Sequence, residues 1–301
     1  DIIEQLEAGA LKSTKSGGTM EVGVTVLPKF PRDAGDRNRT SPFAFTGNRF
    51  EFRAVGSFFS VSGPNVVLNT IVAESLDFVA TELEKSVAGG KSLNQAIAAL
   101  LPGIIKESKK VIFNGNGYSE EWHAEAAKRG LPNLKNTVDA IPTLISKEAI
   151  ALFGKYKVLT ERELHSRYEI FSETYVKTIN IEAQTMLVMA KTMILPAALR
   201  YQAEVAGTVA SLKAAGVDAG PASETLKTLS ETIAKFSAAI AALDKAANHH
   251  AAGDAYAHAK YMRDSVIPKM VELRTYGDAL ETQVADDLWP LPTYREMLFI
   301  K

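Results

Sequence analysis

The sequence predicts an α+β chain, in which a few strands and helices come first and a long antiparallel helical bundle follows. In residues 20–27 and 49–53, apolar side chains alternate with polar, charged or glycine residues. A period of two is typical of a half-buried strand. From Thr160 onward, apolar side chains recur every three or four residues, which is the period of amphipathic helices. Short glycine-containing turns separate these helical stretches and favour antiparallel neighbours.

Composition narrows the possible partners. The chain has 34 Lys and Arg against 35 Asp and Glu, so a nucleic-acid or membrane-surface partner is not expected. The absence of cysteine excludes disulfides and thiolate metal sites and is compatible with a reducing compartment. No apolar run reaches the roughly 20 residues that span a bilayer. We therefore expect a cytoplasmic protein.

The first 47 residues predict few regular elements. Residues 2–11 fit a short helix that starts without a capping residue or initiator methionine, so we expect the chain to be a fragment of a longer protein. A polar, glycine-rich linker follows, then a strand over residues 20–27 and a loop over residues 28–47. A loop of this length inside a compact domain is more often functional than idle.

The stretch Asn48–Arg53 is the main candidate for a functional site. As a strand it places Arg49, Glu51 and Arg53 on one face, and Phe50 and Phe52 on the other face, toward a core.

Further arginines stand upstream in the loop, at Arg37 and Arg39 beside Asp36. An excess of arginine indicates an anionic ligand, because the guanidinium fork matches phosphate and carboxylate oxygens. Glu51 among these arginines would either pair with them or hold a divalent cation. The alternative is an edge strand with an ion-paired polar face.

The next helices are expected from their caps and apolar residues. Pro64 suits the first turn of a helix that is apolar enough to be buried, and residues 93–111 predict another helix, kinked at Pro102. Ser119 is expected to cap a helix that extends to about Lys128, and Ser146 is expected to cap a further short element that extends to Phe153. The glycines of residues 114–117 could cradle phosphate, but Glu120 and its neighbour would repel an anion. The apolar residues of the helix that begins near Pro64 are Val66, Ile71, Leu76, Val79 and Leu83.

Four helical stretches are expected after residue 160. Thr160 and Glu163 form a capping-box pattern that starts a helix ending at Pro196, and a second helix covers residues 197–215. Residues 222–248 would form a third helix of about 40 Å that could meet another subunit. A fourth helix follows the turn at Gly253 and Asp254. The apolar seam of the third helix comprises Leu226, Leu229, Ile233, Phe236, Ile240 and Leu243.

His249, His250 and His258 lie close together in sequence, but their spacing matches no established zinc pattern. Solvated histidines at a helix junction are the expected interpretation. Trp122 and Trp289 are expected to be core or interface anchors.

Three stretches resemble type III glutamine synthetases. Residues 36–53, DRNRTSPFAFTGNRFEFR, resemble the nucleotide and metal segment of that family, and FNGNGYS at 113–119 and DLWPLPTYR at 287–295 also resemble it. The likeness runs from about Met20 to Lys301. It implies that residues 1–159 are the C-terminal part of the catalytic β-barrel domain, and that residues 160–301 are the helical C-terminal region.

The resemblance also implies roles for single residues. Glu51 matches a ligand of the divalent ion, Mg²⁺ or Mn²⁺, that coordinates the phosphates of ATP. Arg53 matches the arginine that contacts glutamate and the transferring phosphoryl group. Arg49, Arg37 and Arg39 fall where the family binds ATP phosphates. The family joins glutamate and ammonia at the expense of ATP, and it forms large ring-shaped homo-oligomers.

Some family features are missing from these residues. The remaining metal ligands, the substrate loop and the β-grasp-like domain belong upstream, and Phe58 and Phe59 replace smaller polar residues. We therefore do not expect this chain alone to make glutamine. A ligase for another amine and a non-catalytic helical oligomerisation module remain as alternatives.

Overall fold

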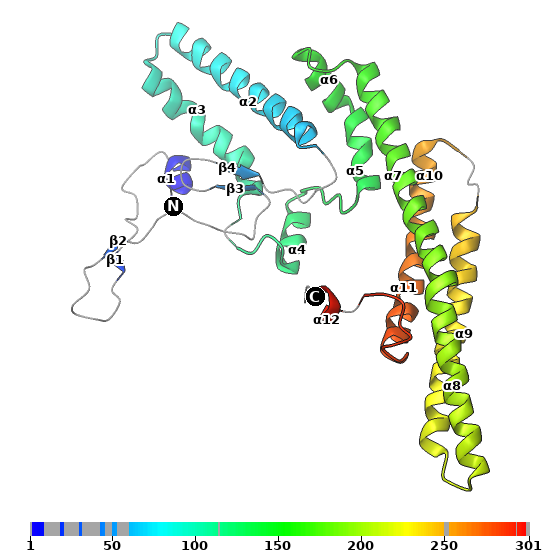
Figure 1. Cartoon of the computed structure of the whole chain (residues 1–301). Helices are drawn as coiled ribbons and strands as arrows, with labels where there is room; N and C mark the ends of the chain where they lie inside the picture. The colour runs from blue at the N-terminus through cyan, green and yellow to red at the C-terminus, as the bar shows by residue number, and fades with distance from the viewer. Residues whose placement is uncertain are drawn as a thin grey trace. The chain divides into compact units, whose positions relative to one another are not determined.

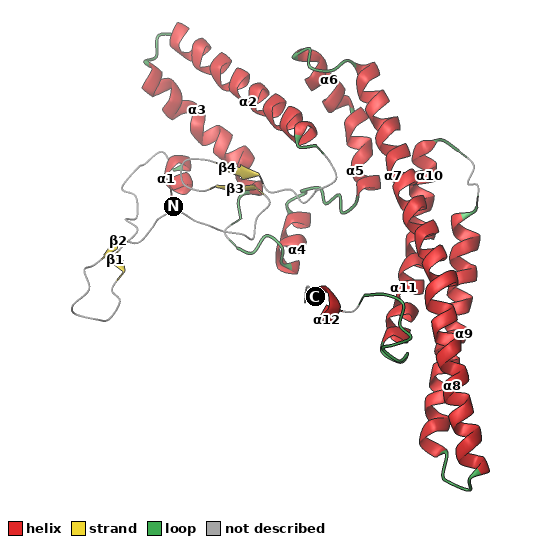
Figure 2. Ribbon diagram, viewed as in Figure 1, coloured by secondary structure: helices red, strands yellow, loops and turns green. Residues whose placement is uncertain are grey.

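The computed structural model describes residues 2–8, 19–20, 30–31, 43–45, 50–52, 60–113, 115–249, 253–292 and 294–298 (Figure 1). The chain divides into two compact units. Unit 1 comprises Asp1–Lys135 and Ala151–Val158, and unit 2 comprises Asn136–Ile150 and Leu159–Lys301. Helices dominate the described residues of both units (Figure 2).

Unit 1 contains two short antiparallel strand pairs. Strand β1 (Thr19–Met20) pairs with β2 (Phe30–Pro31), and β3 (Phe43–Phe45) pairs with β4 (Phe50–Phe52). Because β2 and β3 lie inside residues 28–47, the prediction that this whole stretch is a loop was wrong. Residues 21–27, which were predicted to be a strand, lie outside the described residues.

Within unit 1, one helix packs against two others. Helix α1 (Ile2–Glu7) contacts α3 (Leu93–Ser108), and α3 also contacts α2 (Ser62–Ala88). Helix α3 begins at a capping box, in which the Ser92 hydroxyl accepts from the Gln95 N–H and the Gln95 side chain accepts from the Ser92 N–H. Pro102 lies inside α3, and the helix continues into a 3₁₀ turn, η1 (Lys109–Val111).

The prediction that α2 is buried was wrong for this chain. Thr70 is its one buried residue, and Leu76 is 65% exposed. Apolar side chains are buried only where another element covers them, and among the described residues α3 covers one side of α2.

Shorter helices follow, each preceded by a polar cap. Ser119 caps α4 (Glu120–Lys128), and Asn136 caps α5 (Thr137–Ala140), which continues into the 3₁₀ helix η2 (Ile141–Ile145). The Ser146 hydroxyl accepts from the Ala149 N–H at the start of α6 (Lys147–Lys155). The predicted caps at Ser119 and Ser146 are confirmed.

The longest helical run of unit 2 begins at the predicted capping box. The Thr160 N–H donates to the Glu163 carboxylate at 2.7 Å, and its hydroxyl accepts from the Glu163 N–H at 3.3 Å. Helix α7 (Glu161–Met189) then passes through a π-helical segment, η3 (Ala190–Ile194), into α8 (Leu195–Ala214). The prediction that Pro196 ends the helix was wrong.

A wider turn precedes each of two prolines in unit 2. Proline lacks an N–H and its ring clashes with the carbonyl four residues earlier, and that residue is Thr192 for Pro196 and Asp264 for Pro268. Both residues lie in π-helical segments, η3 and η4 (Met262–Val266). The five-residue spacing of a π turn relieves the clash while the helix continues.

Helix α9 (Gly220–Ala247) packs against several of the long helices of unit 2. Helix α9 contacts α8 and α11 (Ile267–Glu281), while α10 (Ala255–Tyr261) contacts α7 (Figure 1). A short helix, α12 (Tyr294–Leu298), ends the described residues. The predicted seam of α9 is confirmed, since five of its members are buried in one hydrophobic core: Leu229, Ile233, Phe236, Ile240 and Leu243.

None of the helices in the described ranges is both long enough and apolar enough to cross a membrane.

Candidate functional site

The strand pair β3–β4 carries the one predicted site residue that the structure describes. The register places Glu51 opposite Ala44, with Phe45 opposite Phe50 at one end and Phe43 opposite Phe52 at the other end. Glu51 is partly buried. The predicted strand is therefore confirmed over Phe50–Phe52.

Phe52 does not face a core within this chain. Its side chain is 47% exposed, so the prediction of a core-facing Phe52 was wrong here. The reason is the same as for α2, because burial requires a covering element and the chain leaves nearly half of Phe52 uncovered. Nothing is described of the Phe50 side chain, which was predicted to share this face.

The arginines predicted to bind ATP and glutamate lie outside the described residues. They are Arg37, Arg39, Arg49 and Arg53, and Phe58 and Phe59 lie outside as well. The chemistry of Glu51 fits the implied divalent ion, because Mg²⁺ prefers oxygen donors and usually takes one or two carboxylates from the protein. The roles of all five site residues stay predictions.

The turn at residues 113–119 is held by an aromatic stack. The rings of Phe113 and Trp122 lie 4.3 Å apart and nearly parallel, and the Arg129 guanidinium lies 5.4 Å from the Trp122 ring. Arg129 also donates to the carbonyls of Lys110 and Ile112 at 3.2 and 2.9 Å. These contacts tie the chain before the turn to helix α4 after it.

Two features of this turn favour a structural role over phosphate binding. A Cβ at Gly115 would lie 2.5 Å from the Phe113 ring, so glycine is needed for packing. At the start of α4, hydrogen bonds from the backbone N–H of Glu121 and from the Ser119 hydroxyl lower the pKa of the Glu121 carboxyl. The helix N-terminus therefore already has an internal anion.

A second polar cluster in unit 1 joins the end of α6 to α2. The Tyr156 hydroxyl lies 2.6 Å from Glu74 Oε2 and 2.7 Å from Asp77 Oδ2, and Lys155 Nζ lies 2.8 and 3.0 Å from the same two oxygens. Burial and the hydrogen bond to Glu74 raise the pKa of Tyr156 to about 12. Hydrogen bonds from Lys155 and Tyr156 hold the carboxyl pKa values below their usual range. The four groups satisfy one another, which is typical of a structural clasp.

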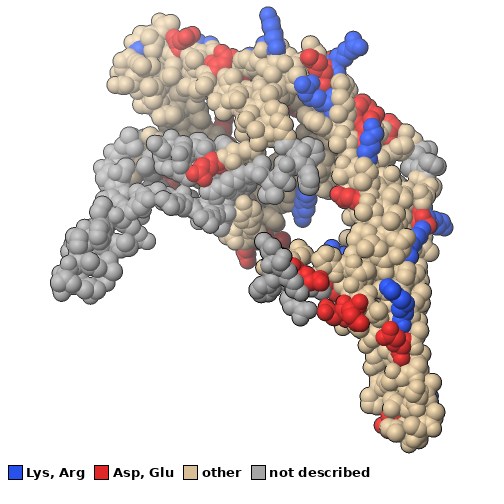
Figure 3. Space-filling model, viewed as in Figure 1, with Lys and Arg blue, Asp and Glu red and all other residues tan. Residues whose placement is uncertain are grey.

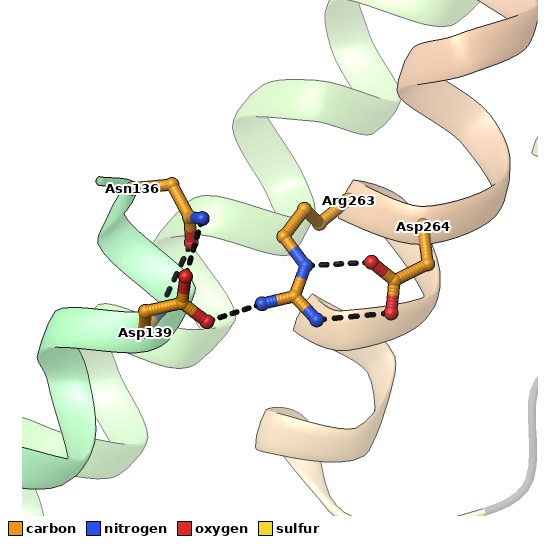
Figure 4. A network of polar contacts seen from close by, with 4 residues as sticks. All are labelled: Asn136, Asp139, Arg263 and Asp264. Atoms are coloured by element: carbon orange, nitrogen blue, oxygen red, sulfur yellow. Dashed lines mark hydrogen bonds and ion pairs between the residues drawn. The ribbon is translucent and has the colours of Figure 1, made fainter. Parts of the chain in front are cut away.

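A corresponding cluster in unit 2 joins α5 to the π segment η4 (Figure 4). Arg263 donates to Asp139 at 2.5 Å, and to both oxygens of Asp264 at 2.6 and 3.0 Å. Asn136 donates to the other oxygen of Asp139 at 2.6 Å. The hydrogen bond from Arg263 lowers the pKa of Asp264, so the Asp264 carboxylate is ionised at neutral pH.

Figure 3 shows acidic and basic side chains interspersed along the visible face of the long helices. Within the described ranges, no group of three or more His, Cys, Asp or Glu residues could hold a metal ion. His250, one of the three neighbouring histidines, lies outside those ranges.

Sequence reasoning missed both polar clusters. Tyr156 lies 82 residues from Glu74, and Arg263 lies 124 residues from Asp139. No local pattern connects residues at such separations, whereas caps within three residues of one another were predictable.

Comparison with known proteins relates the chain to one family. A model of the glutamine synthetase C-terminal domain matches residues 96–213. The chain is 38% identical to the type-3 glutamine synthetase of Dictyostelium discoideum over 94% of its length, and 32% identical to a glutamine synthetase of Bacteroides fragilis, also over 94%. It is 35% identical to a glutamine synthetase of Butyrivibrio fibrisolvens over 90% of its length.

The chain spans about two fifths of the length of these relatives, 39% for the first and 40% for the second. A match to 94% of 301 residues leaves out about 18 residues, so residues 37–53 lie inside the aligned region.

Proposed function

We propose, from the premise that the chain belongs to the glutamine synthetase family, that it is the C-terminal part of an ATP-dependent glutamate–ammonia ligase. The observation that carries the proposal is the match of 38% identity over 94% of the chain to a type-3 glutamine synthetase. The arginine-rich stretch around Glu51 supports it, because its residue types suit phosphate and a divalent ion.

The proposed reaction has two steps. An oxygen of the glutamate side-chain carboxylate attacks the γ-phosphorus of ATP, which releases ADP and leaves γ-glutamyl phosphate. Ammonia then adds to the acyl carbon, phosphate leaves with the electron pair of the broken C–O bond, and a proton is lost to give glutamine. A bound Mg²⁺ or Mn²⁺ would neutralise phosphate charge during the first step.

The residues of this chain would position the anions. Glu51 would hold the divalent ion as one of its ligands, and Arg53 would contact glutamate and the transferring phosphoryl group. Arg37, Arg39 and Arg49 would bind the phosphates of ATP. Phosphoryl transfer depends chiefly on such positioning and charge stabilisation.

We propose that the site is completed by residues beyond this chain. Glu51 would supply only one or two of the roughly six oxygen ligands that such an ion takes, so the others would come from phosphate, water and residues outside this chain. The exposed apolar side chains of α2 and Phe52 are consistent with a β-barrel domain whose other strands belong to the rest of the polypeptide. The isolated chain is then inactive, and the complete protein is a cytoplasmic homo-oligomer.

The test is glutamine formation from glutamate, ammonia and ATP by the complete polypeptide. Glu51→Ala is expected to lower the rate at least a hundredfold, in keeping with the loss of a charged group from a transition-state clamp, while the circular dichroism spectrum stays unchanged. Exposed Glu224→Ala in α9 is the matched control and should keep full activity. Activity of Glu51→Ala equal to the parent would remove Glu51 from the site.

The two alternatives give different results in the same preparation. A ligase for another amine would consume ATP with glutamate only when that amine replaces ammonia. A non-catalytic oligomerisation module would assemble without any ATP turnover. Calorimetric titration of magnesium-ADP into the 301-residue chain, beside Glu51→Ala, would show whether the nucleotide segment binds before the remainder is added.

A further inference from the structure

A pocket of about 360 Å³ lies within unit 2, where α7, the end of α9 and α10 with the start of η4 come together. Its lining residues fall in the stretches 176–184, 247–249 and 258–262. The volume lies at the lower end of the range for small-molecule sites. None of these residues belongs to the stretch proposed to bind ATP, so the ligase proposal does not account for the pocket.

The walls of this pocket combine an apolar surface with basic groups. Met262 and Ala247 supply buried apolar surface, and the Tyr261 ring adds to it. Lys177, His249 and His258 supply the basic groups. Among the residues that the structure describes, no Asp or Glu lines the pocket. This composition fits a small molecule with an aliphatic body and a negatively charged end.

The C-terminus of α9 does not oppose an anion as strongly as a bare helix end would. The Asp244 carbonyl accepts from the backbone N–H and side-chain amide of Asn248 at 3.1 and 3.0 Å. The Ala246 carbonyl accepts from the Tyr261 hydroxyl at 3.1 Å and from the His249 N–H at 3.3 Å. Since the protein itself occupies these oxygens, their partial negative charge is offset beside the pocket.

Lys177 is available to a ligand despite its ion pair. Its ammonium lies 2.8 Å from Glu173, but both side chains are mostly exposed, and exposed pairs one helical turn apart hold each other weakly. A carboxylate in the pocket would therefore compete for Lys177 with little loss.

We propose that this pocket binds a small organic carboxylate, with its charged end at Lys177 and His258 and its aliphatic body against Met262. The hydrogen bonds from the ammonium and the imidazole would be charge-assisted and so carry most of the selectivity for anions. The Met262 methyl group would report occupancy directly.

The test uses the 301-residue chain labelled with ¹³C at its methionine methyl groups, with Met262 assigned through Met262→Leu. Succinate is the probe, and its neutral diamide is the matched control ligand. Succinate should shift the Met262 resonance saturably with a dissociation constant of about 1 mM, and the diamide should leave it in place. The absence of a saturable shift, or equal shifts with both compounds, would overturn the proposal.

Variants distinguish binding in the pocket from nonspecific attraction of succinate to basic surface residues. Lys177→Ala and His258→Ala should each weaken succinate binding about tenfold, the usual effect of losing one hydrogen bond to a charged group. Lys235→Ala and His165→Ala remove exposed residues that do not line the pocket and should bind as the parent does. A far-UV circular dichroism spectrum equal to that of the parent shows that each variant is folded. Equal losses in all four variants would contradict the proposed site.

Discussion

Helices α2 and α9 have nearly the same length, 27 and 28 residues, but they differ in burial. Helix α2 buries one residue, Thr70, whereas α9 buries seven. Phe78 of α2 is 51% exposed, and Phe236 of α9 is 1% exposed. The comparison shows that apolar content alone does not determine burial, which also requires elements that cover both sides of a helix.

The same difference extends to the units that contain these helices. The hydrophobic core cluster consists of residues between Ala183 and Val284, all in unit 2. Unit 1 leaves apolar side chains of α2 exposed, and contiguous exposed apolar surface marks an interaction site in most soluble proteins. Unit 2 therefore carries its own core, and the proposed function would make unit 1 part of a larger catalytic domain. The exposed apolar residues of α2 are Val66, Val67, Ile71, Val72, Leu76, Phe78 and Val87.

The largest expected effect on stability comes from truncating one buried side chain in the core of unit 2. Phe236→Ala should lower the free energy of unfolding by about 3–5 kcal/mol, because it removes a fully buried ring and leaves a cavity. Urea denaturation of the chain, followed by circular dichroism, measures the change.

Phe78→Ala is the matched control in α2. It should change the free energy of unfolding of the same chain by less than about 0.5 kcal/mol, as exposed substitutions do. Equal losses of unfolding free energy for Phe236→Ala and Phe78→Ala would contradict the difference in burial between the two helices.

A medium effect is expected at the start of α7. Thr160→Ala removes the side chain that accepts from the Glu163 N–H, and should cost about 1 kcal/mol of unfolding free energy. Thr185→Ala lies in mid-helix, where its hydroxyl only donates back to the Ile181 carbonyl, so it should be nearly neutral. A loss for Thr185→Ala as large as that for Thr160→Ala would count against the cap.

The smallest effect is a change with pH in unit 1. The pKa of Tyr156 is raised from 10.0 to about 12, so the folded state retains the phenolic proton longer than the unfolded state does. The stabilisation is fully present below pH 10 and is lost as the pH rises toward about 12. Tyr156→Phe should remove this part of the alkaline loss of stability.

Tyrosinate absorbance measured against pH tests the assignment. The difference between parent and Tyr156→Phe should show one tyrosine ionising near pH 12. Ionisation of that tyrosine near pH 10 would contradict the clasp with Glu74 and Asp77.

Local patterns in the sequence predicted local structure correctly. The caps at Ser119, Ser146 and Thr160 depend on hydrogen bonds within three residues, so a short window contains all the information. The seam of α9 was predictable because helical spacing places its residues on one face.

Properties that depend on distant residues were not predictable from such windows. The exposure of α2 depends on which elements cover it. The continuation of the helix through Pro196 is a separate case, because a local π turn relieves the proline clash and the apolar spacing does not distinguish such a turn from a helix end. The clasp of Arg263 with Asp139 joins residues 124 positions apart.

The candidate site was predicted in two separate ways. Strand alternation predicted that Glu51 lies on a strand, which is confirmed, while its role as a metal ligand came from family resemblance and stays a prediction. Arg53 and the other arginines owe their predicted roles to the same resemblance. A residue's type and spacing indicate the kind of ligand it suits, but the ligand itself depends on groups contributed by the rest of the site.

Hydrogen–deuterium exchange of α2 and α9, compared between the 301-residue chain and the complete polypeptide, tests the central claim most directly. We predict that protection of the α2 amides rises strongly when the remainder of the catalytic domain is present, while the α9 amides are equally protected in both, because α9 is already buried in its own core. Equal protection of α2 in the two proteins would show that this helix has no partner in the upstream domain and would contradict the account.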